Sequence, residues 1–193
     1  MLKTSQEIQQ KNHTILPDNS DAFISVLFNF YKIKIKSMSA LKEGSKAPAF
    51  KGKDQNGNLI SLADFKGKNV VLYFYPQDDT PTCTVQACNL RDNYGVLKNH
   101  GFEVIGISPD EVIKHKKFET KHELPFTLIA DPELKIIEKY GAWGEKSMYG
   151  KKYMGLLRTT FIIDSKGVIK HIISKPKAKV HADEILELWE GGV

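Results

Sequence analysis

Residues 70–88 read VVLYFYPQDDTPTCTVQAC, and this stretch decides the fold class. Val70 to Tyr75 are apolar or aromatic without polar alternation, which is typical of a strand buried on both faces. Pro76 ends the strand, and a turn leads into a helix. The helix is predicted because apolar residues recur at spacings of three and four: Ala87, Leu90, Tyr94 and Leu97. A buried strand followed by an amphipathic helix indicates an α/β fold.

Strands and helices continue to alternate beyond this unit. Further strands are expected at residues 103–107, 126–130, 159–164 and 168–173, and helices that end before Gly101, Gly141 and Gly191. Asn56-Gly57, between apolar segments, predicts an N-terminal hairpin. Ser108-Pro109-Asp110-Glu111 has the pattern of a capping box at a helix start. The sequence therefore predicts a mixed central sheet flanked by helices.

Two later segments complete the prediction. The Gly-rich connection from Gly141 to Gly155 is expected to be a long loop, at the mouth of the active site or at an oligomer contact. In the closing helix, residues 182–190, the side chains of Ile185, Leu188 and Trp189 are expected to face the core.

Length and composition favour one globular domain. The chain has 193 residues, 41% hydrophobic and 26% charged, which excludes wholesale disorder, and its net charge of +5 is too mild to indicate a nucleic-acid partner.

The apolar run at residues 22–31 is shorter than the roughly 18 to 20 residues of a membrane helix and lacks the cationic start of a signal peptide. Because Met38 offers a second start, residues 1–38 are interpreted as an N-terminal extension, disordered or non-native, before a domain at 39–193.

The two cysteines, Cys83 and Cys88, lie in the helix that follows the strand. Cys83 falls in the first turn, where free backbone N–H groups and the helix dipole favour a thiolate. Cysteines in such settings have pKa values of about 3.5–7.5, against about 8.5 when free. Two Cα atoms five residues apart on a regular helix are separated by about 8–9 Å, whereas a disulfide needs about 4.4–6.8 Å. A bond between them requires the helix to unwind, which is typical of a catalytic rather than a structural disulfide.

The residues alone leave other classes open. Helical cysteines are commonly small hydrophobic core residues, and no C-x-x-C pair is present. A non-catalytic redox sensor would use the same pair to switch helix order, and a basic nucleic-acid-binding protein would carry it incidentally. The histidines show no metal-binding spacing and are expected to be at the surface or partly buried: His13, His100, His115, His122, His171 and His181.

Pro76, Thr80 and Cys83 form the pattern P-x-x-x-T-x-x-C, and Cys88 follows five residues later. Together with collinear segments such as Arg158 to Asp164, this pattern resembles the peroxiredoxins, and most closely their Q-type subgroup, the bacterioferritin comigratory proteins. The resemblance covers nearly all of the chain from about residue 39 to residue 189. One departure is Thr82, where Q-type members usually have glycine, so we expect narrower access to the sulfur and a changed preference among peroxides.

The resemblance implies a thioredoxin-like fold and a thiol-dependent peroxidase that reduces hydrogen peroxide and organic hydroperoxides. It assigns Cys83 as the peroxidatic and Cys88 as the resolving cysteine, joined in an intramolecular disulfide after turnover. Thr80 is expected to orient the peroxide, Arg158 to stabilise the thiolate and the transition state, and Pro76 to shield the sulfur from water.

The same resemblance implies the partners of the reaction. Thioredoxin, or a glutaredoxin-like protein, is expected to reduce the disulfide. The scheme includes no cofactor, metal, nucleic acid or membrane, and it places the protein in the cytoplasm as a monomer or homodimer.

Overall fold

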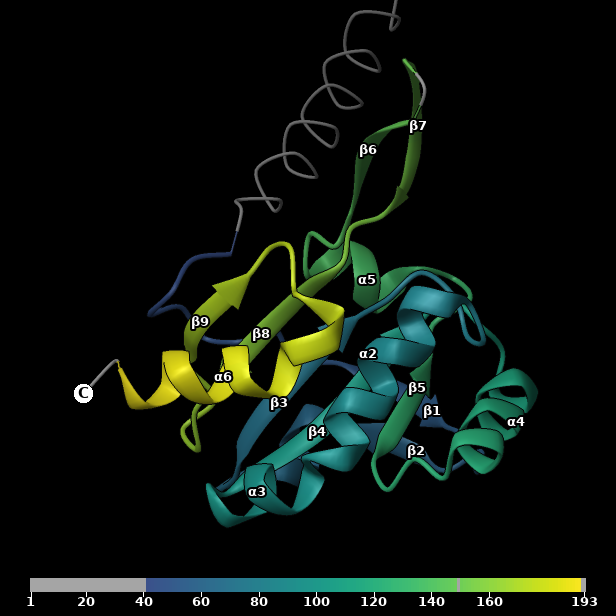
Figure 1. Cartoon of the computed structure of the whole chain (residues 1–193). Helices are drawn as coiled ribbons and strands as arrows, with labels where there is room; N and C mark the ends of the chain where they lie inside the picture. The colour runs from purple at the N-terminus through teal and green to yellow at the C-terminus, as the bar shows by residue number, and fades with distance from the viewer. Residues whose placement is uncertain (1–40, 149, 192–193) are drawn as a thin grey trace, which may run out of the picture. The chain divides into compact units, whose positions relative to one another are not determined.

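The computed structural model describes residues 41–148 and 150–191. These residues form a seven-stranded mixed sheet in the order β2-β1-β5-β4-β3-β8-β9 and a separate two-stranded sheet, β6-β7 (Figure 1). The strands are β1 (Lys51–Asp54), β2 (Leu59–Ser61), β3 (Asn69–Phe74), β4 (Phe102–Ser108), β5 (Thr127–Ala130), β6 (Trp143–Met148), β7 (Lys151–Leu156), β8 (Thr159–Ile163) and β9 (Ile169–Ile173). The helices are α2 (Pro81–Asp92), α3 (Tyr94–Asn99), α4 (Val112–His122), α5 (Lys135–Lys139) and α6 (His181–Glu190), with 3-10 turns η1 (Leu62–Phe65) and η2 (Ala178–Val180).

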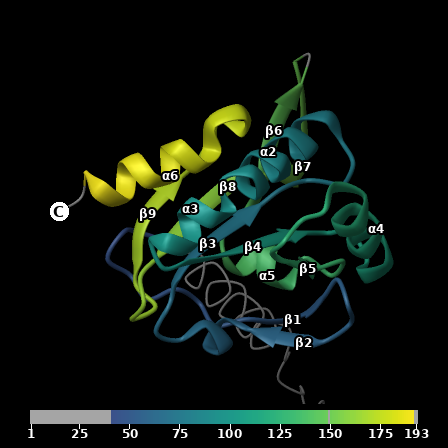
Figure 2. The ribbon, with the colours of Figure 1, turned by 60° about the horizontal axis from the view of Figure 1, so that its bottom comes forward.

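Alternation along the central strand β3 divides the core into two layers. The odd-numbered residues from Val71 to Tyr75 pack with side chains of α2, α3, α4 and α6. The even-numbered residues from Val70 to Phe74 pack on the other face with α5 and with Phe50, just before β1. Figures 1 and 2 show α2 and α6 side by side over the first of these faces. Both faces of β3 are therefore covered, which confirms the prediction from its unbroken apolar run.

Parallel pairing brings three loops to one edge of the sheet. β3 is parallel to β4, and β4 is parallel to β5, so the carboxyl ends of these strands meet there. The segments that leave this edge are residues 75–80 before α2, 109–111 before α4 and 131–134 before α5. β8 runs antiparallel to β3 with Thr159 opposite Phe74, which brings the residue before β8 to the same edge.

The predicted fold class is confirmed, including the N-terminal hairpin. β1 and β2 pair antiparallel with Lys51 opposite Ser61. The turn between them contains Gly57 with φ of 83°, a left-handed conformation that glycine adopts without strain.

Two helix boundaries differ from the sequence prediction. The helix expected to reach Gly101 is interrupted at Asn93, which ends α2 and precedes α3. Helix α4 begins at Val112 rather than inside the predicted capping box. Ser108 does not cap it, because its hydroxyl accepts the N–H of Asp110 and donates to the Asp110 carboxylate, each at 3.0 Å.

The connection from Gly141 to Gly155, predicted to be a loop, is instead the β6–β7 hairpin, which projects beyond the main sheet (Figure 1). Residues 151–154 are all exposed, so neither face of β7 carries the apolar alternation that indicates a strand. The closing helix also differs in one position. Ile185 and Trp189 pack on the core as expected, whereas Leu188 is 37% exposed.

The predicted N-terminal extension, residues 1–38, lies outside the described residues and stays a prediction. Among the residues that are described, no helix is long and apolar enough to span a bilayer.

Candidate active site

Cys83 lies in the first turn of α2, at the sheet edge where β3 ends. Thr80 is the N-cap residue with an extended backbone, and Pro81 occupies the first helical position, where its missing N–H costs no hydrogen bond. As the third helical residue, Cys83 has an N–H without an intrahelical acceptor. Its side chain is only 1% exposed. The sulfur is thus placed where a helix N-terminus stabilises negative charge.

Two donors converge on the sulfur of Cys83. The hydroxyl of Thr80 lies 2.8 Å from Sγ, and Nη2 of Arg158 lies 3.0 Å from it. The Thr80 hydroxyl is also 3.0 Å from the carbonyl oxygen of Gln77, a second acceptor for the same proton. Pro76, half-buried, begins the loop that ends at Thr80. Thr80, Cys83 and Arg158 therefore form one contact group, and Pro76 lies in the loop that leads to it.

The sheet register explains how Arg158 reaches Cys83 across 75 residues of sequence. Thr159 pairs with Phe74, the last residue of β3, so Arg158 sits next to the loop that leaves β3. Its Nη1 donates to Oε1 of Gln86 at 2.9 Å, one turn further along α2. One planar guanidinium therefore joins the sulfur to a second residue of the same helix.

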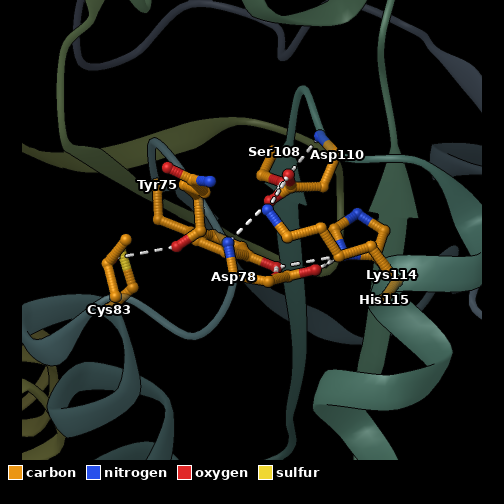
Figure 3. A network of polar contacts seen from close by, with 9 residues as sticks. Tyr75, Asp78, Cys83, Ser108, Asp110, Lys114 and His115 are labelled. Carbon is orange, nitrogen blue, oxygen red and sulfur yellow. Dashed lines mark hydrogen bonds and ion pairs between the residues drawn. The ribbon is translucent and has the colours of Figure 1, made fainter.

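A buried network holds the loop between β3 and α2 (Figure 3). The Asp78 carboxylate accepts from the Tyr75 hydroxyl at 2.6 Å and contacts Nδ1 of His115 at 2.7 Å. The backbone N–H of Asp78 donates to the Asp110 carboxylate at 2.6 Å. Burial raises the pKa of Tyr75 well above its usual value, so the hydroxyl remains a donor. These contacts tie the loop to α4 and to the segment before it.

A second chain of buried hydrogen bonds begins at Gln86, the partner of Arg158. Gln86 Nε2 lies 3.1 Å from Nδ1 of His181, and Nε2 of His181 lies 3.0 Å from the hydroxyl of Thr160. Burial, together with the charge of Arg158, lowers the pKa of His181 to about 3. The imidazole is therefore neutral at physiological pH.

Cys88 is half-buried on the same helix, and both cysteines are free thiols. Since α2 is continuous from Pro81 to Asp92, the two Cα atoms are separated by the regular helical spacing, too far for a disulfide. The structure thus brings Thr80, Cys83 and Arg158 together and leaves Cys88 apart from them.

The sequence did not identify the residues that support this group. His115 and His181 are fully buried, which corrects the expectation that the histidines are at the surface or only partly buried. Gln86 and Asp78, also buried, carry no motif of their own. Asp78 lies inside the recognised loop, and that position was the one available signal for it. No cluster of three or more histidine, cysteine or acidic side chains within the described residues could hold a metal.

Fold and site together define a class: a thioredoxin-like protein with a buried thiol that faces a hydroxyl and a guanidinium. Comparison with known proteins agrees. The model of the AhpC/TSA family matches residues 44–172. Peroxiredoxin Bcp of Escherichia coli is 46% identical over 149 residues, 77% of this chain and 96% of that protein. Peroxiredoxin Bcp of Bacillus subtilis is 44% identical over 144 residues, 75% of this chain and 92% of that protein.

Solved structures give the same result. A mutant of peroxiredoxin Q from Xanthomonas campestris aligns with a TM-score of 0.70 at 28% identity, covering 75% of this chain and 92% of that one. BcpB from Mycobacterium tuberculosis aligns with a TM-score of 0.69 at 31% identity, covering 78% and 97%. The chain belongs to the AhpC/TSA family, and within it to the peroxiredoxins of the Q type, the bacterioferritin comigratory proteins.

Proposed function

We propose that this thiol peroxidase reduces hydrogen peroxide and organic hydroperoxides with Cys83 as the peroxidatic cysteine. The observation that carries the proposal is the sulfur held between Thr80 and Arg158 at a helix N-terminus. A structure of a bacterioferritin comigratory protein from Xanthomonas campestris, described in terms of alkyl peroxide reduction, supports the substrate class.

The first step is attack of the Cys83 thiolate on one peroxide oxygen. A sulfur–oxygen bond forms, the oxygen–oxygen bond breaks, and the departing oxygen takes a proton to leave as water or an alcohol. Cys83 is oxidised to sulfenic acid and the peroxide is reduced. Arg158 stabilises the negative charge that moves onto the oxygens, and the Thr80 hydroxyl orients the peroxide. Pro76, at the start of the loop, limits the approach of water.

The second step joins Cys83 to Cys88. The Cys88 thiol condenses with the sulfenic acid, a disulfide forms, and water is released. Because the regular helix keeps the two residues apart, the first turns of α2 unwind before this bond closes. In the intact helix Cys83 is buried and Cys88 is half-buried. Unwinding therefore also exposes the new disulfide to an external dithiol.

Thioredoxin is the proposed reductant, with a glutaredoxin-like protein as the alternative, and the cytoplasm is the proposed compartment because such dithiols are kept reduced there. All five proposed site residues come from one chain, so a monomer suffices for the chemistry and a homodimer remains compatible with it.

A coupled assay tests this proposal. Steady NADPH consumption with peroxide, thioredoxin and thioredoxin reductase is expected of the natural sequence, and none of Cys83→Ser. Cys88→Ser should react once, accumulate a sulfenic acid that dimedone traps, and lose turnover with thioredoxin. Normal turnover by Cys88→Ser would remove the resolving assignment. A single oxidation per molecule without turnover, in the natural sequence, would instead favour the redox sensor.

A further inference from the structure

His181 lies at the start of α6, 95 residues after Gln86 in the helix that carries Cys83, yet a continuous chain of contacts joins His181 to Cys83. The chain runs from Cys83 Sγ to Arg158, then to Gln86, His181 and Thr160, with successive distances of 3.0, 2.9, 3.1 and 3.0 Å. Gln86, Thr160 and His181 are each at most 1% exposed. The links beyond Arg158, from Gln86 to His181 and from His181 to Thr160, are therefore shielded from bulk water.

The chemistry of the donors fixes the direction of every link. A guanidinium can only donate, so the atom of Gln86 that faces Arg158 is the amide oxygen. The amide nitrogen then faces His181 and donates to Nδ1, which must be unprotonated. The remaining proton of the neutral imidazole lies on Nε2 and is donated to the hydroxyl of Thr160. Only one tautomer of His181 satisfies all of these bonds.

We propose that His181 is a positioning residue for the peroxidatic site: its neutral Nε2–H form holds the Gln86 amide in one orientation, and Gln86 thereby holds Arg158 against Cys83. Without an acceptor at Nδ1, the amide is free to turn. The turned amide would present its nitrogen to the guanidinium, two donors facing each other in a buried site. Arg158 would then lose the partner that fixes its plane.

The surroundings of the imidazole suit this role. Its ring lies edge-on to Tyr73 of β3, with centroids 6.3 Å apart, and Thr160 of β8 holds the opposite nitrogen. His181 therefore sits between two strands and α2, and contacts from three sides hold the orientation of its ring. His181, the positioning residue, belongs to α6, and Arg158, which it positions through Gln86, lies at the sheet edge.

The test measures the thiol and the peroxidase reaction separately, since this inference rests on the proposed function but has a readout of its own. In a Cys88→Ser background, alkylation of Cys83 by iodoacetamide is followed against pH, without peroxide. His181→Leu is expected to move the midpoint upward by about one pH unit, because the guanidinium no longer stays on the sulfur. Oxidation of Cys83 by hydrogen peroxide is expected to slow by about tenfold or more.

Two companion variants separate positioning from mere stability. His181→Asn places an amide oxygen near the position of Nδ1 and is expected to recover most of both effects. Asn89→Ala is the matched control, since Asn89 also joins α2 to the C-terminal segment through two hydrogen bonds, to Lys179 O at 3.0 Å and from Ala182 N at 2.8 Å, without contacting Arg158. It is expected to leave the alkylation midpoint unchanged.

Outcomes are distinct. If His181→Leu does not fold, Gln86→Met removes the amide while keeping a strong helix former, and the same shift is expected. An unchanged alkylation midpoint in folded His181→Leu, or in Gln86→Met, overturns the inference, as does an equal shift in Asn89→Ala. If the midpoint shifts as expected but the natural sequence shows no turnover of peroxide, the positioning role stands and the proposed function fails.

Discussion

Arg158 shows how much of this site depends on the shape of one side chain. Its two terminal nitrogens serve two different acceptors, the sulfur of Cys83 and the amide oxygen of Gln86. A compact ammonium has the same charge but cannot keep both contacts in one plane. The P-x-x-x-T-x-x-C pattern identifies Cys83 and Thr80 as candidate site residues. The sequence gives no such signal for Gln86, whose role follows from its contact with Arg158.

Replacing Arg158 tests the separate parts played by charge and geometry. Arg158→Met is expected to slow oxidation of Cys83 by hydrogen peroxide by about a hundredfold or more, the cost of losing one positioned donor to a developing oxyanion. Arg158→Lys is expected to fall between that variant and the natural sequence. Stopped-flow fluorescence or rapid quenching with mass analysis gives the rates. Equal rates for arginine and lysine would show that charge alone is sufficient.

Thr82 allows a test of access to the sulfur. It is exposed and directly precedes Cys83 at the start of α2, where we expect its side chain to narrow the approach. Thr82→Gly is expected to raise the rate with a bulky hydroperoxide such as cumene hydroperoxide more than the rate with hydrogen peroxide. Thr82→Ser, which keeps the hydroxyl, serves as the control. The ratio of the two rate constants is the measurement, and an unchanged ratio would mean that access is set elsewhere.

At the scale of elements, the loop between β3 and α2 is held by side chains that also anchor α4. Asp78 is buried and joins Tyr75, His115 and the segment at Asp110. Its neighbour Asp79 faces solvent and pairs with Lys121 and His122 at the surface. Two adjacent aspartates thus differ in burial and in the consequence of losing their charge.

This contrast provides a matched pair of variants. Asp78→Asn is expected to lower the free energy of unfolding by about 3 kcal/mol, since an amide nitrogen replaces one of the two buried carboxylate oxygens that contact Tyr75 and His115. Asp79→Asn is expected to change it by less than about 1 kcal/mol, as is usual for exposed pairs, and asparagine also tolerates the φ of 59° at this position. Urea unfolding at pH 7 gives both values. Similar losses in the two variants would contradict the assigned burial.

Sequence patterns located elements with one or two buried faces better than elements without them. The unbroken apolar run of β3 and the Asn56-Gly57 turn predicted their structures correctly. The β6–β7 hairpin was missed because its exposed residues carry no period. The residues that support the site were missed for another reason. Gln86 and His181 meet across 95 residues, and no local pattern records such a contact.

For the molecule as a whole, a buried neutral histidine makes stability depend on pH. The pKa of His181 is lowered to about 3 by burial and by Arg158, against about 6.5 for an unfolded chain. Between these values the unfolded state binds a proton that the folded state does not, so acid favours unfolding. The free energy of unfolding is therefore unaffected by the titration of this histidine above about pH 6.5, and it decreases progressively as the pH falls toward 3.

The comparison of two proteins isolates this effect. The free energy of unfolding of the reduced natural sequence is expected to fall by about 1.4 kcal/mol more per pH unit, between pH 6 and pH 4, than that of His181→Asn. Urea titrations at several pH values give the slopes, and the carboxylates common to both proteins cancel. Parallel slopes would show that His181 takes up a proton without unfolding.

Hydrogen bonds join Gln86 and Asn89 to the C-terminal segment while α2 is intact. Closing the proposed disulfide unwinds the first turns of α2, which include Gln86, so the hydrogen bond from Gln86 to His181 favours the dithiol over the oxidised form. Stabilising the reduced form makes a disulfide a stronger oxidant, one that accepts electrons more readily from a donor. By this reasoning, the last helix of the chain helps to set the reduction potential of a cysteine pair that it does not contain.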